Sequence, residues 1–301
     1  MNDKKFLSRY PSLSGKTVVL SGSTGGIGVC LARYLSLLGA RLLLLDRNRE
    51  KAEALKRKLL CEFPSVEIKL LTADLTNETS VARAADLLSG EPIDFLILNA
   101  GAYKIPRKVC KSGYNNVFLI NYASPFYLVN RLLPTLKAQN GRVIAVGSIA
   151  HRYSKTDPED TDFSSRRADS LLYGNAKRRL MFSLYSLFRN EEDATLSVVH
   201  PGITLTNITN HFPKLVFALI KYPMKVIFMP PKNACLSIIE GLFSECKTGE
   251  WIGPRVFDIW GSPKKRKLKI SRDEMARVAE DSARVLEKYQ AATEENENAA
   301  L

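Results

Sequence analysis

The sequence predicts an α/β protein with a Rossmann-type, doubly wound parallel sheet of about seven strands in a single domain. Short, almost wholly apolar segments alternate with segments of helical periodicity over the first two-thirds of the chain. A cluster of glycines directly follows the first apolar segment, and no Pro/Gly/Ser-rich linker or internal repeat divides the chain. Because the expected strands are apolar over their whole length, helices should cover both faces of the sheet.

The expected strands are the short segments rich in residues that favour β-structure or buried positions. They comprise residues 17–20, 41–45, 66–71, 94–98, 142–146 and 195–200, with a seventh near residues 251–260.

Three helices can be placed from the spacing of apolar residues, at residues 27–38, 49–60 and 272–290. The last of these has one apolar face, which should pack on the domain or on a partner subunit. We therefore divide the chain into one main domain, residues 1–262, and a C-terminal part, residues 263–301. The C-terminal part holds a basic run, the amphipathic helix and a flexible tail.

The composition is ordinary for a soluble globular protein with a sizeable core. The 301 residues are 45% hydrophobic and carry a formal net charge of +13. Most of this charge is dispersed, but residues 263–269 form a dense basic run. No aromatic-rich binding face accompanies the run, so we interpret it as a solvated loop and expect no nucleic-acid partner. An address signal or a contact with acidic lipid are the alternatives.

Cysteine and histidine usage points to a cytoplasmic protein without a metal site. None of the five cysteines lies at metal-ligand spacing from another, so we expect reduced thiols. The three histidines are scattered. The chain starts with a polar segment that lacks an apolar signal core, and no apolar run could span a bilayer.

The glycine cluster is the expected dinucleotide site. It lies between a strand and a helix, where glycines permit a sharp turn and let the backbone approach a pyrophosphate. The following helix offers free N–H groups at its N-terminus. The candidate cofactor residues here are Gly22, Ser23, Thr24, Gly26, Ile27 and Gly28.

Asp46 and Arg47 end the second expected strand and bear on the choice of cofactor. A carboxylate at this position commonly holds the adenosine ribose hydroxyls and would repel a 2′-phosphate, which favours NAD. Arg47 could accept that phosphate, which would favour NADP, and Asp46 could instead cap the next helix. The balance favours NAD.

Two further segments follow strands at the same edge of the sheet. Asp74, next to Leu75, could accept the adenine amino group, or it could cap a helix ahead of Glu78. Asn99, Ala100 and Gly101 follow the fourth strand, where small residues permit close approach of the cofactor.

The candidate catalytic pair is Tyr173 and Lys177, four residues apart in a helical segment and therefore on one face. A neighbouring ammonium favours the phenolate and should lower the pKa of Tyr173. A phenol tuned in this way can exchange a proton with an alcohol oxygen. The pattern alone is common, so its weight depends on the rest of the site.

Three other features strengthen this interpretation. Ser148 ends the fifth strand and could bond a substrate carbonyl, or it could be a cap. Asn121 lies in the middle of an expected helix, where asparagine has poor propensity. The turn at Pro201 and Gly202 could bring the backbone and Thr204 near a carboxamide.

Taken in order along the chain, these motifs resemble the short-chain dehydrogenase/reductase family over residues 14–262. The resemblance implies an oxidoreductase that transfers a hydride between NAD or NADP and an alcohol or carbonyl. It implies Tyr173 as acid or base and Lys177 as the residue holding the nicotinamide ribose. Ser148 would polarise the substrate oxygen, and Asn121 would anchor a water.

Two features refine this resemblance. Leu98 stands where the family often has a second asparagine, and residues 151–170 form a polar insertion similar to that of the retinol-dehydrogenase-like branch. Residues 207–231 are very apolar and correspond to the family's substrate cover. A hydrophobic substrate is therefore expected, with peripheral membrane contact and a homo-oligomer as possible further partners. The rival hypothesis is a sensor or scaffold that binds the dinucleotide without chemistry.

Overall fold

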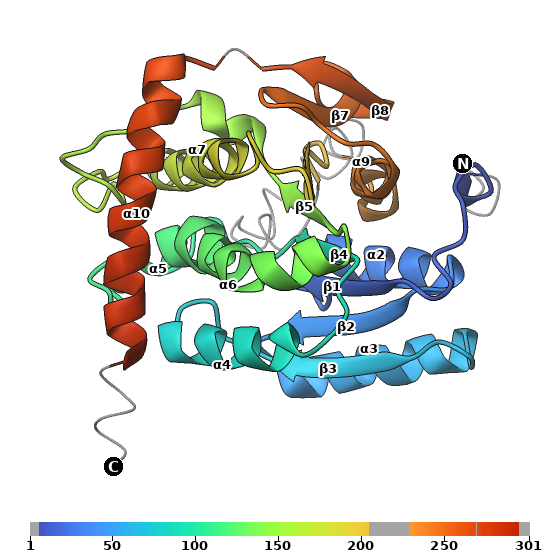
Figure 1. The fold of residues 1–301 in the computed structure, drawn as a ribbon. Helices are drawn as coiled ribbons and strands as arrows, with labels where there is room; N and C mark the ends of the chain where they lie inside the picture. Colours follow the sequence, from blue (N-terminus) through green and yellow to red (C-terminus); the bar gives the residue numbers. More distant parts are fainter. Residues whose placement is uncertain (1–5, 205–228, 269, 295–301) are drawn as a thin grey trace, which may run out of the picture.

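The structure, a computed structural model, describes residues 6–204, 229–268 and 270–294. Within these residues the chain forms one eight-stranded sheet in the order β3-β2-β1-β4-β5-β6-β7-β8 (Figure 1). The first seven strands pair in parallel, which confirms the predicted Rossmann-type sheet. The strands are β1 (Thr17–Ser21), β2 (Arg41–Asp46), β3 (Ile68–Thr72), β4 (Phe95–Leu98), β5 (Arg142–Val146), β6 (Thr195–Val199), β7 (Glu250–Val256) and β8 (Trp260–Lys267).

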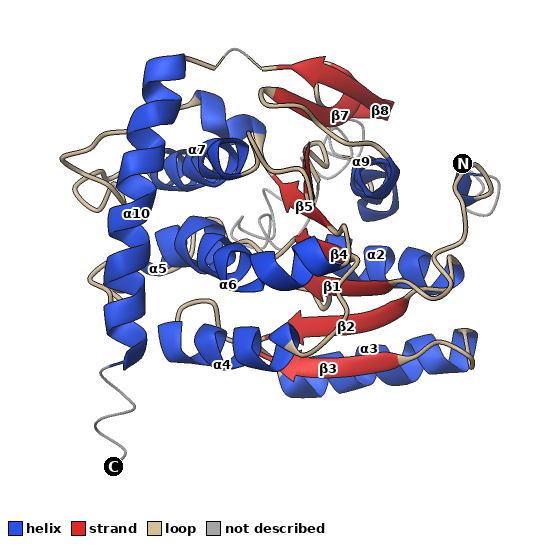
Figure 2. Ribbon diagram, in the orientation of Figure 1, coloured by secondary structure: helices blue, strands red, loops and turns tan. Residues whose placement is uncertain are grey.

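Helices cover both faces of the sheet (Figure 2). One face carries α2 (Gly26–Leu37), α3 (Arg49–Glu62) and α9 (Pro231–Phe243); the other carries α4 (Glu78–Ser89), α6 (Ser124–Ala138), α7 (Asp169–Leu187) and α10 (Arg272–Glu294). Successive strand residues face opposite sides, so Val18 and Val19 belong to two different buried clusters. This explains why the central strands β1, β4 and β5 are almost wholly apolar.

Asparagine caps fix the starts of two crossover helices. The Asn48 side chain accepts a hydrogen bond from the backbone N–H of Lys51 at the start of α3, over 2.8 Å. The Asn77 side chain does the same for Ser80 in α4, over 3.0 Å. Neither Asp46 nor Asp74 caps the helix that follows it, so the capping alternative considered for each of these residues is wrong.

The basic run is a strand and not the expected loop. Residues 263–267 lie in β8, which pairs antiparallel with β7 at the edge of the sheet. The lysines of β8 are exposed. Lysines on an edge strand discourage further strand pairing, and they hide the apolar alternation that identifies most strands.

The C-terminal helix α10 packs on its own domain, against α4 and α7 (Figure 1). Its buried face includes Val278, Val285 and Tyr289. The Tyr289 ring stacks on Tyr127 at 4.5 Å, and its hydroxyl lies 2.9 Å from Ser124 Oγ. The prediction that this apolar face packs on its own domain is therefore confirmed.

No helix in the described part of the chain is long and apolar enough to cross a membrane. The expected substrate cover, residues 207–231, lies outside the described residues except for its last three positions. The tail beyond Glu294 also lies outside them. None of the five cysteines, all of which lie within the described residues, forms a disulfide bond.

Candidate active site

The order of the strands reverses between β1 and β4, so the loops that follow these two strands lie together at one edge of the sheet. The Asn99 side-chain amide donates to the carbonyl oxygens of Ser21 and Gly22, over 3.0 and 3.1 Å. Ligands of open α/β sheets bind in the crevice at such a reversal. The predicted glycine cluster and the segment that begins at Asn99 are therefore brought together.

The glycine-rich loop has no room for side chains at two of its positions. Gly22 has a positive φ of 70°, and a Cβ there would lie 2.9 Å from Ala100 Cα. A Cβ on Gly28 would lie 2.1 Å from the Gly22 carbonyl oxygen. Helix α2 begins directly after Gly25, with no side-chain cap and no acidic residue in its first turn. Its free N–H groups suit a pyrophosphate, so the predicted loop fits a dinucleotide.

Asp46 is buried against this loop. Its carboxylate accepts hydrogen bonds from the hydroxyls of Ser23 and Thr24, and from the Thr24 backbone N–H over 3.0 Å. The neighbouring Arg47 is exposed. The bonds of Asp46 to Ser23 and Thr24 therefore shape this turn of the glycine-rich loop.

Asp74 and Leu75 lie at the carboxyl end of β3. The Asp74 carboxylate accepts from the backbone and the hydroxyl of Thr76, over 2.9 and 2.8 Å, which makes a local turn. The Leu75 carbonyl accepts from Ser124 Oγ over 2.8 Å. Of all the predicted cofactor residues, these two have the clearest structural roles of their own.

Asn121 lies in a π-helical turn, Leu119–Ala123, between α5 (Asn116–Phe118) and α6. Its amide donates to the Val117 and Ala102 carbonyls, both over 2.8 Å. The wide turn changes which backbone groups pair, and such turns are frequent at functional sites. A Cβ on Gly101 would lie 2.9 Å from Asn121 Oδ1 and 3.5 Å from Lys177 Nζ, so these three residues meet at one point.

Tyr173 and Lys177 project from the same face of α7, as predicted. The Lys177 ammonium lies 5.9 Å from the centre of the Tyr173 ring and donates to the Val146 carbonyl over 2.9 Å. Burial lowers the pKa of Lys177 to about 8. Burial raises the pKa of Tyr173 to about 12, and the hydrogen bond with Ser148 acts in the opposite direction. The expected lowering of the Tyr173 pKa is therefore not found, because removal from water disfavours the phenolate more than the Ser148 hydrogen bond favours it.

Ser148 bonds Tyr173 from the end of β5. It also caps the short helix η2 (Ile149–Arg152), because its Oγ accepts from the Ala150 N–H over 3.2 Å. The capping alternative for this serine is confirmed, and its bond to a substrate carbonyl stays a prediction. Ser148, Tyr173 and Lys177 form one cluster, with Asn121 reached through Lys177 and Gly101.

The turn at Pro201 and Gly202 follows β6 at the same edge. Gly202 has a positive φ of 82°, and a Cβ there would lie 2.8 Å from the Ile259 carbonyl oxygen. Thr204 is buried and forms a bridge with Met229. The turn is close-packed, and its predicted contact with a carboxamide stays a prediction; residues 205–228, which follow Thr204, lie outside the described residues.

Three residues near Tyr173 were not assigned roles from the sequence. The Tyr103 ring meets the Tyr173 ring edge-on at 5.3 Å. Tyr153 follows η2 and is largely exposed. His151 Nδ1 lies 2.7 Å from the Ser148 carbonyl oxygen. Tyr103 could have been found from its position directly after Gly101 and Ala102, whereas the other two lie within the insertion.

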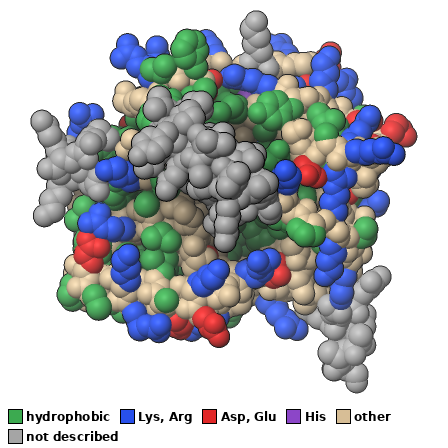
Figure 3. Space-filling model, turned by 180° about the vertical axis from the view of Figure 1, so that it is seen from behind, with side chains coloured by type: hydrophobic (Ala, Val, Ile, Leu, Met, Phe, Trp, Pro, Cys, Tyr) green, Lys and Arg blue, Asp and Glu red, His purple; other side chains and the backbone are tan. Residues whose placement is uncertain are grey.

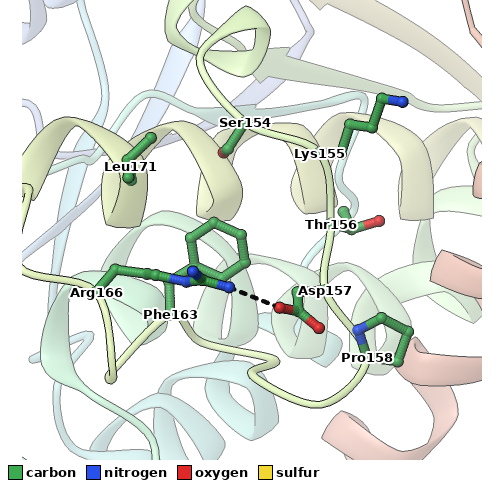
Figure 4. Close-up of a pocket in the computed structure, with 8 residues that line it drawn as sticks. All are labelled: Ser154, Lys155, Thr156, Asp157, Pro158, Phe163, Arg166 and Leu171. Carbon is green, nitrogen blue, oxygen red and sulfur yellow. Dashed lines mark hydrogen bonds and ion pairs between the residues drawn. The ribbon is translucent and has the colours of Figure 1, made fainter.

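The polar insertion is an ordered part of this site. The Asp162 carboxylate accepts from the backbone and the side chain of Asn115, over 2.7 and 2.8 Å. Phe163 packs in the same cluster as Tyr173. The insertion also lines a pocket (Figure 4), whose residues are Ser154, Lys155, Thr156, Asp157, Pro158, Phe163, Arg166 and Leu171.

The fold and the site together define a dinucleotide-dependent oxidoreductase of the Rossmann type. A family model of the short chain dehydrogenases matches residues 16–157. Retinol dehydrogenase 14 of Mus musculus is 30% identical over 275 residues, which are 82% of each chain. The chain belongs to the short-chain dehydrogenase family and has retinol-dehydrogenase-like relatives.

Other similar proteins agree with this assignment. Short-chain dehydrogenase TIC 32 A, chloroplastic, of Brassica napus is 30% identical; the match covers 65% of this chain and 66% of that protein, just under two thirds. An uncharacterized protein from Mycobacterium Paratuberculosis has a solved structure with 26% identity, 96% and 97% coverage and a TM-score of 0.73. A short-chain dehydrogenase from Sphingobium yanoikuyae in complex with NADPH shares the fold, with 22% identity, 76% and 84% coverage and a TM-score of 0.58.

Proposed function

We propose that this chain transfers a hydride between a nicotinamide cofactor and a hydrophobic alcohol or carbonyl compound, with Tyr173 as the acid or base. The observation that carries the proposal is the cluster of Ser148, Tyr173 and Lys177 beside the glycine-rich loop. The cofactor, when bound, supplies the hydride chemistry. The chain supplies orientation, the exclusion of water and the proton.

Each side chain of the cluster has a separate task in this proposal. Tyr173 gives its phenolic proton to the carbonyl oxygen during reduction and takes it back during oxidation. Ser148 donates a hydrogen bond to the same substrate oxygen. Lys177 binds the nicotinamide ribose through the N–H groups that Val146 leaves free. Asn121 holds a water that connects Lys177 to solvent.

We propose NAD as the preferred cofactor, with NADP as the alternative. The buried Asp46 carboxylate places a negative charge beside the adenosine half of the site, where it would repel a 2′-phosphate. The exposed Arg47 next to it supports the alternative, as does the NADPH in the Sphingobium yanoikuyae structure.

A hydrophobic substrate is supported by the tyrosines around the site and by the retinol dehydrogenases among the relatives. The Tyr103 ring meets the Tyr173 ring edge-on, which supplies aromatic surface beside the proposed acid or base. We add cytoplasmic residence and the capacity to form homo-oligomers to the proposal. Peripheral membrane contact rested on residues 207–231 and stays a prediction.

The decisive experiment is a panel of hydrophobic aldehydes, ketones and steroids, assayed with both NADH and NADPH. The Tyr173→Phe variant should lose turnover by a factor of at least about 10², yet bind the cofactor like the unchanged chain. A variant that keeps its rate would refute the role of Tyr173. Cofactor binding without turnover of any compound would favour the sensor or scaffold.

A further inference from the structure

Two arginines directly after Lys177 connect the catalytic helix α7 to the C-terminal helix α10. The Arg178 guanidinium donates to both oxygens of Glu274, each over 2.6 Å. Arg179 reaches Asp281 Oδ2 over 3.1 Å. Both pairs are largely shielded from water; the Arg178 and Glu274 side chains are only 12% and 6% exposed. A carboxylate buried in this way depends on all of its hydrogen bonds.

The same groups also hold the polar insertion. Arg178 Nη1 donates to the His151 carbonyl over 2.8 Å. The Glu274 carboxylate accepts from the backbone N–H and the hydroxyl of Thr156, each over 3.2 Å. The Arg178–Glu274 pair therefore fixes the segment between residues 151 and 156 at both of its ends.

This segment begins at the catalytic cluster. The His151 backbone N–H and its Nδ1 lie 3.1 and 2.7 Å from the Ser148 carbonyl oxygen. Ser148 in turn bonds Tyr173. An unbroken series of hydrogen bonds therefore leads from Glu274 through Arg178 and His151 to the Ser148 backbone.

We propose that Glu274, about 100 residues downstream of the catalytic pair, is a positioning residue for the active site. It holds residues 151–156 through Arg178 and Thr156, and thereby fixes Ser148 and Tyr153 around Tyr173. The rival explanation is that Glu274 only attaches α10 to the domain. The apolar residues Val278, Val285 and Tyr289 already attach α10 to the domain, because they lie in its buried core. The bonds of Glu274 go instead to the insertion and to the arginine that holds it.

Amide hydrogen exchange on the full chain tests this inference without any substrate. Glu274→Gln keeps the shape of the side chain but removes its charge. We expect amides of residues 150–156 to exchange at least about tenfold faster, because the local opening free energy falls. The control is Glu280→Gln, an exposed glutamate of the same helix, which should leave exchange unchanged. Unaltered exchange at residues 150–156, or faster exchange along the whole of α10 instead, would overturn the proposal.

Kinetics provide the second measurement, and this part rests on the proposed function. At a temperature where both chains are folded, Glu274→Gln should lower kcat/KM by about tenfold, while the Kd of the cofactor stays within about twofold. Arg178→Met should cause a similar loss, and the double variant should add little to either single change, because the two residues act in series. A full rate for Glu274→Gln would contradict the inference and leave the oxidoreductase proposal intact. If the unchanged chain is inactive, the oxidoreductase proposal fails. The inference about Glu274 is then decided by hydrogen exchange alone.

Discussion

The ammonium of Lys177 donates to the backbone carbonyl of Val146 over 2.9 Å, which ties the catalytic helix to the end of β5. Burial lowers the pKa of this lysine to about 8 and raises that of Tyr173 to about 12. Both shifts favour the neutral form, as expected of groups removed from water. The hydrogen bond from Ser148 is the contact that favours the phenolate.

This balance predicts how the reaction depends on pH. Oxidation needs the Tyr173 phenolate, so its kcat/KM should rise with pH as pH approaches the raised pKa of Tyr173. Reduction needs the neutral phenol, so kcat/KM for reduction should not rise with pH. The Ser148→Ala variant loses the hydrogen bond that lowers the pKa of Tyr173. The rise in kcat/KM for oxidation should therefore move to higher pH. Measured pH profiles of kcat/KM check this, and coincident profiles for the two chains would contradict it.

The glycine-rich loop allows a matched pair of substitutions. In Gly28→Ala the new Cβ would lie 2.1 Å from the Gly22 carbonyl oxygen, so the loop or the start of α2 must shift. We expect a loss of ~2–4 kcal/mol in the free energy of unfolding, together with loss of dinucleotide binding. In the control, Gly25→Ala, the nearest atom is 3.5 Å away, and the free energy of unfolding should barely change. Urea denaturation and cofactor titration measure both effects; equal stability of the two variants would refute the steric argument.

The negative charge of Asp46 lets us predict how its substitution changes the preference between NAD and NADP. Asp46→Asn removes the charge that disfavours a 2′-phosphate while keeping an oxygen that can accept from Thr24. The ratio of the Kd for NADPH to that for NADH should fall about tenfold, which corresponds to ~1.4 kcal/mol. Arg47→Ala should raise the same ratio if the exposed guanidinium assists the phosphate. Fluorescence titration with each cofactor measures the ratios, and an unchanged ratio in Asp46→Asn would show that Asp46 serves only the loop.

Apolar continuity was sufficient to predict the parallel strands. The expected segments at residues 17–20, 41–45 and 142–146 each overlap an observed strand to within one residue. A strand buried on both faces is marked by its own composition, independently of its neighbours. The carboxyl ends of such strands then share one edge, which is why Ser148 and Asn99 could be placed near the cofactor site before the structure was known.

Features that depend on tertiary contacts could not be predicted in the same way. The strand β8 is basic because it lies at an edge, and its pairing with β7 has no signal in its own residues. The π-helical turn at Asn121 has no mark in the local sequence. The contact of Arg178 with Glu274 joins two segments that are far apart in the sequence, so no local pattern indicates it. The division of the chain at residue 262 stays a prediction, and β8 runs across that point.

The burial of His200 lets us predict how the free energy of unfolding changes at acidic pH. It follows β6, its ring stacks on the Trp251 ring at 5.1 Å, and both of its ring nitrogens are buried. Burial lowers its pKa from 6.5 to about 3. Between these values the unfolded chain binds a proton that the folded chain does not, so stability falls as pH drops below 6.5. The loss attributable to His200 should reach ~2 kcal/mol at pH 5.

His200→Phe removes this proton and keeps an aromatic ring against Trp251. Its free energy of unfolding should therefore fall less steeply between pH 6.5 and pH 4, by about one proton in the slope, than that of the unchanged chain. Urea denaturation at several pH values gives both slopes, and measurements above pH 7 show whether the phenylalanine fits the cavity. Parallel slopes in the two chains would mean that His200 takes up its proton in the folded state, and that its ring is not held neutral by burial.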